Sequence, residues 1–201
     1  MSAATVTPLP RLPAPPRPVS VTADEFHHLW DSGFFKGLRR VILVDGEMIE
    51  MPMPDPPHDI GVSATDEFLR AAFPTGHYVR NQQGFNAGLD TDPGPDLAVV
   101  RGSFRDYTRH PATAVLVVEV ANSSLAYDRR QKTHIYAAAG VPEYWVLDVT
   151  GRQLLVFRDP VADPAAERGH RYATQLSLAE GDTASPQAAP AAGVVVRNLL
   201  P

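Results

Sequence analysis

One stretch decides the fold: residues 114–120 read Ala114-Val115-Leu116-Val117-Val118-Glu119-Val120. All but one of these residues are apolar, and the valines are β-branched residues that favour strands. An apolar run without polar alternation is typical of a strand covered on both faces of a sheet. The run therefore predicts a central strand. Glu119 is an anomaly in it, because a buried ionised carboxylate costs several kcal/mol unless it is paired, hydrogen-bonded or bound to a metal.

Helix and strand patterns alternate on both sides of this strand. Thr22-Ala23-Asp24-Glu25 has the form of a capping box and begins a short helix that stops near Gly33. Asp45-Gly46 between two apolar runs predicts a hairpin. Further helices are expected over 58–73 and 127–139, and strands near 78–79, 85, 89, 95–100, 143–147, 153–157, 172–178 and 194–196. The predicted fold class is α/β (α+β), a mixed β-sheet flanked by helices.

The chain length of 201 residues suits one domain with a tail. The first 18 residues contain six prolines and few large apolar side chains, which predicts a disordered Pro-rich leader over 1–18 and a single domain over 19–201. No apolar run approaches the roughly 20 residues that cross a bilayer, and no signal peptide is visible. We therefore expect a cytoplasmic protein without a membrane partner.

Composition excludes several classes of function. The chain has no cysteine, which removes disulfides, thiolate chemistry and cysteine-ligated metal sites. The formal net charge of -5 argues against a sequence-independent DNA coat, although a local basic groove remains compatible with it. The seven histidines show no ligand spacing along the chain, so we expect surface or packing roles for them, with His134 the one candidate for a place near a site.

Three acids are candidates for one oxygen-rich site. Asp96 begins a mostly apolar strand, Glu119 lies near the end of the central strand, and Glu47 opens the second arm of the hairpin. Carboxylates converging at a sheet edge suit Mg²⁺ or Mn²⁺, which prefer hard ligands. Each acid alone has a plainer interpretation: a turn residue, a partner of an arginine, or a solvent-facing charge.

Lys132 is a second anomaly, because the chain has only two lysines against sixteen arginines. Its compact ammonium can hydrogen-bond a water or a phosphate oxygen as a point charge. Asp128 lies four residues earlier on the same predicted helix face, so a routine surface ion pair is the alternative.

Together these segments resemble the Uma-two family of restriction endonucleases, within the PD-(D/E)XK nuclease superfamily. The resemblance spans most of the chain from residue 21 to about residue 157. It rests on five blocks: Val44-Asp45-Gly46-Glu47, Pro95-Asp96-Leu97-Ala98-Val99-Val100, Val117-Val118-Glu119-Val120-Ala121-Asn122-Ser123-Ser124, Tyr127-Asp128-Arg129-Arg130-Gln131-Lys132 and Tyr136-Ala137-Ala138-Ala139-Gly140-Val141-Pro142-Glu143-Tyr144-Trp145-Val146-Leu147-Asp148. The last block is the most specific.

The resemblance implies a restriction-endonuclease-like core and an Mg²⁺- or Mn²⁺-dependent endonuclease that hydrolyses phosphodiester bonds in nucleic acid, DNA being the expected substrate. It implies Asp96 and Glu119 as metal ligands, and Glu47 as an auxiliary acid for a second metal or a metal-bound water. Lys132 would orient the attacking water and stabilise the developing charge. A homodimer would suit cleavage of both strands.

The chain departs from the superfamily motif at one position. The motif places lysine two residues after the glutamate on the same strand, and here that position is Ala121. The family usually replaces that lysine by one from the following helix, which Lys132 matches. Arg101, Arg105 and Arg109 follow the Asp96 strand as possible phosphate contacts or as an ordinary solvated loop.

Two other classes of function compete with the enzyme. One is a catalytically inactive module that keeps the nuclease fold to bind nucleic acid or protein. The other is a structural homodimer whose acids merely pair with arginines.

Overall fold

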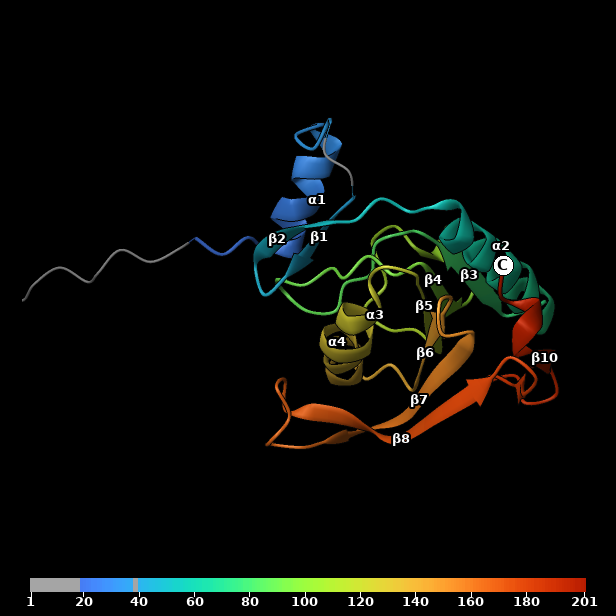
Figure 1. The fold of residues 1–201 in the computed structure, drawn as a ribbon. Coiled ribbons are helices and arrows are strands. Elements are labelled where there is room, and N and C mark those ends of the chain that lie inside the picture. The colour runs from blue at the N-terminus through green and yellow to red at the C-terminus, as the bar shows by residue number, and fades with distance from the viewer. Residues whose placement is uncertain (1–18, 38–39) are drawn as a thin grey trace, which may run out of the picture.

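A six-stranded mixed sheet forms the centre of the computed structural model, which describes residues 19–37 and 40–201 (Figure 1). The strand order is β3-β4-β5-β6-β7-β8, with β5 and β6 parallel and the other neighbours antiparallel. The strands are β3 His77–Asn81, β4 Leu97–Arg101, β5 Leu116–Ala121, β6 Glu143–Asp148, β7 Gln153–Ala162 and β8 His170–Ala179. The predicted fold class is confirmed, and the run that contains Glu119 is a central strand.

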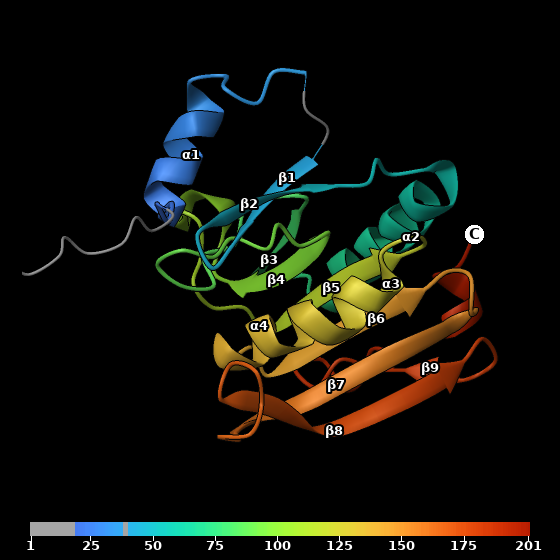
Figure 2. The ribbon, with the colours of Figure 1, turned by 60° about the vertical axis from the view of Figure 1, so that its left-hand side comes forward.

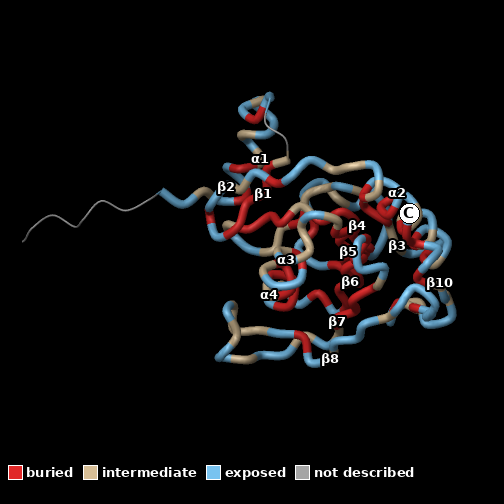
Figure 3. The backbone as a smooth tube through the Cα atoms, viewed as in Figure 1, coloured by how far each residue is buried: buried red, intermediate tan, exposed pale blue. Residues whose placement is uncertain are grey.

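Helices cover the two faces of this sheet. Alternate residues of β4, β5 and β6 belong to two separate core clusters, because successive side chains of a strand point to opposite faces. One cluster includes Val62 and Leu69 of α2 (Pro56–Ala72), and the other includes Tyr136 and Ala137 of α4 (Thr133–Ala138). Figure 2 shows α3 (Leu125–Tyr127) and α4 in front of the strands. The strands between the two layers are the most buried part of the chain (Figure 3).

The first helix and the hairpin form a small unit beside the main sheet. The Thr22 hydroxyl caps α1 (Ala23–Asp31), and the Glu25 carboxylate accepts from the Thr22 amide at 2.8 Å, so the predicted capping box is present. The hairpin consists of β1 (Arg40–Val44) and β2 (Glu47–Met51). Asp45 and Gly46 both have positive φ, as its tight turn requires. A bridge between Leu43 and Asp92 ties the hairpin to the loop before β4.

Gly61 lies inside α2 for a packing reason. A Cβ atom there would lie 2.9 Å from Val120 Cγ1 and 3.3 Å from Leu147 Cδ2. The glycine therefore allows α2 to approach β5 and β6 closely, which offsets its low helix propensity.

Several details differ from the predictions. The stretch around Phe85 and Leu89 forms a loop with isolated bridges, and Phe85 is buried by packing rather than by strand pairing. The predicted helix over 127–139 is interrupted, since a π-helical turn η2 (Asp128–Lys132) separates α3 from α4. The remaining short elements are η1 Phe104–Asp106, β9 Thr183–Ala184, β10 Val194–Val195 and η3 Val196–Asn198.

The predicted leader over residues 1–18 lies outside the described residues. Among the helices that the structure describes, none has the length and apolar character to span a membrane.

Candidate active site

Asp96 and Glu119 meet because β4 and β5 run antiparallel. Leu97 pairs with Val118, so the next pair of positions along the two strands is Asp96 and Glu119. Residues directly opposite each other in an antiparallel pair project to the same face. Both side chains are almost fully buried, with residue exposures of 2% and 1%.

The Asp96 carboxylate is surrounded by donors from three segments. Oδ1 accepts from Arg40 Nη1 at 2.9 Å, and Oδ2 accepts from the Val120 amide at 2.9 Å. Oδ2 also lies 3.3 Å from His58 Nε2. Burial alone would raise the pKa of Asp96, but His58, Arg40 and Lys132 hold it well below its usual range. Asp96 is therefore ionised at neutral pH.

The two basic partners of Asp96 are fixed by its charge. Burial opposes protonation of His58, but the hydrogen bond and charge of Asp96 outweigh it and raise the histidine's pKa. Arg40 begins β1 and also donates to the Gly94 carbonyl. Asp96 thus links the hairpin and α2 to the N-terminal end of β4 in the sheet.

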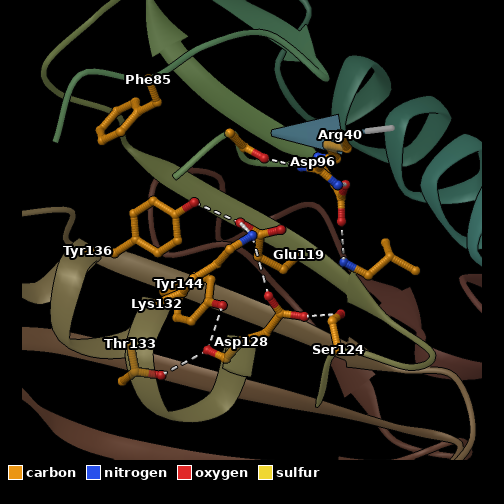
Figure 4. Close-up of polar contacts among 12 residues, drawn as sticks. Arg40, Phe85, Asp96, Glu119, Ser124, Asp128, Lys132, Thr133, Tyr136 and Tyr144 are labelled. Carbon is orange, nitrogen blue, oxygen red and sulfur yellow. Dashed lines mark hydrogen bonds and ion pairs between the residues drawn. The ribbon is translucent and has the colours of Figure 1, made fainter. Parts of the chain in front are cut away.

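Glu119 is held by groups from the helical segment that follows β5 (Figure 4). Its Oε1 lies 2.8 Å from Lys132 Nζ and accepts from the Tyr136 hydroxyl at 2.7 Å. Burial raises the pKa of Glu119 to about 8, although the Lys132 ammonium opposes this shift. Burial would lower the pKa of Lys132, but Glu119 and Asp128 raise it. The lysine therefore stays protonated, and burial favours the protonated form of Glu119.

The π-helical turn places Lys132 and Asp128 in the same site. Asp128 Oδ1 lies 3.3 Å from Lys132 Nζ, and Asp128 Oδ2 accepts from the Ser124 hydroxyl. The Asp128 carbonyl accepts from the Tyr144 hydroxyl at 2.9 Å, which fixes the turn to β6. A π-helical turn inside a helix is uncommon and frequently marks a functional site.

These groups surround a cavity of about 30 Å³, which is the space of one water molecule or one small ion. Asp96, Glu119, Asp128 and Lys132 all line it. The buried Asp128 Oδ1 accepts no hydrogen bond from the described residues, and its contact is the ion pair with Lys132 Nζ at 3.3 Å. Carboxylate oxygens in this number suit a hard divalent cation such as Mg²⁺ or Mn²⁺, so the donor set fits the metal that the sequence predicts.

The structure brings three of the four predicted site residues together and leaves the fourth outside. Asp96, Glu119 and Lys132 line one cavity, whereas Glu47 is exposed and does not line it. Glu47 pairs with Val44 beside the hairpin turn, and the opposite end of the hairpin, Arg40 with Met51, reaches the cavity. Five strand residues span about 13 Å, so Glu47 lies at the end of β2 away from the cavity.

Sequence reasoning missed two basic residues of the site. His58 was expected to be a surface or packing residue and instead contacts Asp96, and Arg40 carried no signal at all. Asp128 was recognised only as a partner of Lys132. The residues Arg101, Arg105 and Arg109 are exposed and do not line the cavity, which agrees with the solvated-loop alternative.

Comparison with known proteins places this arrangement in context. A solved structure described as a putative nuclease belonging to DUF820, from Anabaena variabilis ATCC 29413, has a similar fold, with a TM-score of 0.67. The two chains are 15% identical, and the match covers 89% of this chain and 97% of the other. No curated protein matches the chain. A family model, Uma2, whose description reads "Putative restriction endonuclease", matches residues 23–197. The chain therefore belongs to the Uma2 family.

Proposed function

We propose that this protein is an endonuclease that hydrolyses phosphodiester bonds in DNA with Mg²⁺ or Mn²⁺. The observation that carries the proposal is the contact of Lys132 Nζ with Glu119 Oε1, at 2.8 Å, on the wall of a cavity that Asp96 shares. The family and the nuclease fold support the class of reaction.

The donor set assigns a role to each acid. Asp96 and Glu119 would hold the metal ion, which supplies an activated water and neutralises charge on the scissile phosphate. Asp96 is already ionised and needs no proton loss to act as a ligand. Burial raises the pKa of Glu119 to about 8, and metal binding favours its ionised form.

Lys132 replaces the lysine that the motif places on the strand. Its ammonium is fixed between Glu119 and Asp128, so its position costs no reorganisation during the reaction. A fixed positive charge beside the ligands stabilises negative charge that develops on the phosphate. His58 and Arg40 keep Asp96 charged and oriented toward the end of β5.

Supercoiled plasmid incubated with purified protein tests the proposal. We expect nicking that requires Mg²⁺ or Mn²⁺ and is abolished by EDTA. Asp96→Asn and Glu119→Gln should each lower the rate by about 100-fold or more, and Lys132→Met should lower it by about 10²–10³-fold. Lys36→Met is the matched control, because Lys36 is the other lysine of the chain and is exposed.

The experiment has two outcomes that contradict the proposal. Cleavage that persists unchanged in Asp96→Asn assigns the activity to a contaminant or another site. If the folded protein cleaves no plasmid with any divalent ion, the proposed endonuclease activity is also excluded.

The inactive binding module is the second candidate, and one observation favours it. Both Asp96 oxygens already contact basic side chains, Arg40 on one and His58 on the other, as in a self-sufficient structural ion cluster. This candidate predicts DNA retention that weakens with salt, without turnover, and that Glu119→Gln leaves unchanged.

A further inference from the structure

A second cluster of metal-ligating side chains lies apart from Asp96 and Glu119. It consists of His27 on α1, Asp92 in the loop before β4, and His110 in the loop before β5. One ligand atom from each residue lies within 4.8 Å of the others. His27 and Asp92 are 65 positions apart in the sequence, so no spacing along the chain reveals the cluster.

Asp92 is the buried member and is already oriented. Its Oδ1 accepts from the amides of Phe85 and Gly94, both at 3.0 Å. Its Oδ2 is thereby turned to His27, whose Nε2 lies 2.7 Å away. Two backbone donors thus fix Oδ1, as in carboxylates that bind metals, while Oδ2 and His27 Nε2 share a hydrogen bond that a bound ion would replace.

His110 completes the group from the other side. Its ring centre lies 4.4 Å from that of His27. Its Nδ1 lies 3.3 Å from Arg80 Nη2, which also donates to the Gly84 carbonyl at 3.3 Å.

Gly84 provides independent evidence that the backbone makes room for this cluster. A Cβ atom at Gly84 would lie 2.7 Å from Asp92 Oδ2 and 2.8 Å from His110 Nδ1. Contacts below 3.0 Å require the neighbours to shift, so any side chain here would push two of the three ligand residues apart.

We propose that His27, Asp92 and His110 form a second metal site, for a borderline divalent ion such as Zn²⁺, with a water or another ligand in the fourth position. Two imidazoles and a carboxylate match a three-ligand zinc site with an open position. Zinc bonds of about 2.0–2.2 Å put ligand atoms of a tetrahedron about 3.5 Å apart, so closure from the present spacing needs shifts of about 1 Å.

The fourth coordination position of the proposed ion would face a cavity. All three residues line a cavity of about 470 Å³, and Arg40, the partner of Asp96, lines it too. The ion would also tie α1 to the loops before β4 and β5. Arg80 is the charge that opposes a cation here, and its guanidinium also lies over the Tyr107 ring.

The full chain is first stripped of metal with EDTA, which is then removed. Titration with Zn²⁺ in the presence of excess Mg²⁺ then tests the site independently of nuclease activity. We expect one Zn²⁺ per chain by calorimetry, and Co²⁺ in its place should give the visible absorption of a four-coordinate site. His27→Gln and His110→Gln should each weaken Zn²⁺ binding by about 100-fold or more. His110 is exposed, so its variant should fold, and far-ultraviolet circular dichroism checks this.

Matched controls separate this site from the proposed active site. His28→Gln changes the exposed neighbour of His27 on the same helix and should bind Zn²⁺ as the wild type does. Asp96→Asn should also retain it. Wild-type protein that binds no Zn²⁺, or a folded His110→Gln variant that binds it with unchanged affinity, overturns the inference. Loss of Zn²⁺ in Asp96→Asn with retention in His110→Gln assigns the ion to the other cavity and overturns it as well.

Discussion

Lys132 and Glu119 form a buried ion pair between a π-helical turn and a central strand. Lys132 Nζ lies 2.8 Å from Glu119 Oε1, and both residues have exposures of 1%. A lysine placed two residues after Glu119 would come from the same strand, but that position holds Ala121, which is fully buried in the core. The helix after β5 therefore supplies the ammonium that the strand lacks.

Loss of Lys132 should cost more stability while Glu119 is present than after Glu119 has been replaced. Lys132→Met leaves Glu119 and Asp128 without their shared counter-ion, so we expect a loss of about 3 kcal/mol or more at pH values above 8. In a Glu119→Gln background the same change should cost less, with a coupling energy of about 1 kcal/mol or more. Urea denaturation of the four proteins measures this cycle. Additive costs, or an equal loss in the exposed Lys36→Met control, would contradict the pairing.

The stability of the metal-free protein should fall as the pH rises through the range in which Glu119 loses its proton. Its pKa is raised from 4.5 to about 8, so the folded state binds this proton more tightly than the unfolded state. Each pKa unit corresponds to about 1.4 kcal/mol, and a few kcal/mol are therefore present at low pH and lost toward pH 8. Glu119→Gln keeps the shape without the titration.

Denaturation of wild type and Glu119→Gln between pH 5 and pH 9, with EDTA present, separates this effect from other titrations. The difference in unfolding free energy between the two proteins should move in favour of the glutamine variant as the pH rises. Parallel curves would mean that Glu119 titrates at its ordinary pKa.

Sequence patterns predict the structure of individual elements, each from its own periodicity and turn residues. The apolar run around Glu119, the Asp45-Gly46 turn and the Thr22 capping box each predict a local structure, because local backbone rules and side-chain alternation determine them. The register Leu97 with Val118, which sets Asp96 opposite Glu119, depends on strand pairing and is not visible in either strand alone.

Contacts between distant segments could not be predicted. Arg40 reaches Asp96 across 56 positions, and the loop conformation before β4 decides this contact. For the same reason, the sequence does not reveal the contact of His58 with Asp96. It also does not reveal the cluster of His27, Asp92 and His110. The sequence pattern singled out Asp96, Glu119, Lys132 and Glu47, and the family resemblance implied their roles; the hairpin places Glu47 away from the other three.

Gly61→Ala should destabilise the protein although alanine is the better helix former. The added methyl would lie 2.9 Å from Val120 Cγ1, and overpacking of this kind costs about 1–3 kcal/mol against a propensity gain of about 1 kcal/mol. Thermal and urea unfolding measure the net loss. Ser63→Ala, on the exposed face of the same helix, should change stability by about 0.5 kcal/mol at most. A stabilised Gly61→Ala protein would show that α2 and β5 are less closely packed than the structure has them.

Glu47→Gln should leave plasmid nicking within about twofold of the wild-type rate, because a surface change of about 0.5 kcal/mol or less corresponds to that factor. The residue is exposed beside the hairpin turn, and its side chain does not line the cavity of Asp96 and Glu119. Rates measured at several Mg²⁺ concentrations separate an effect on metal affinity from one on turnover. Glu119→Gln, the same chemical change inside the cavity, is the matched comparison. If Glu47→Gln lost as much activity as Glu119→Gln, the hairpin would have to move its turn toward the cavity during the reaction, and the auxiliary role of Glu47 would be restored.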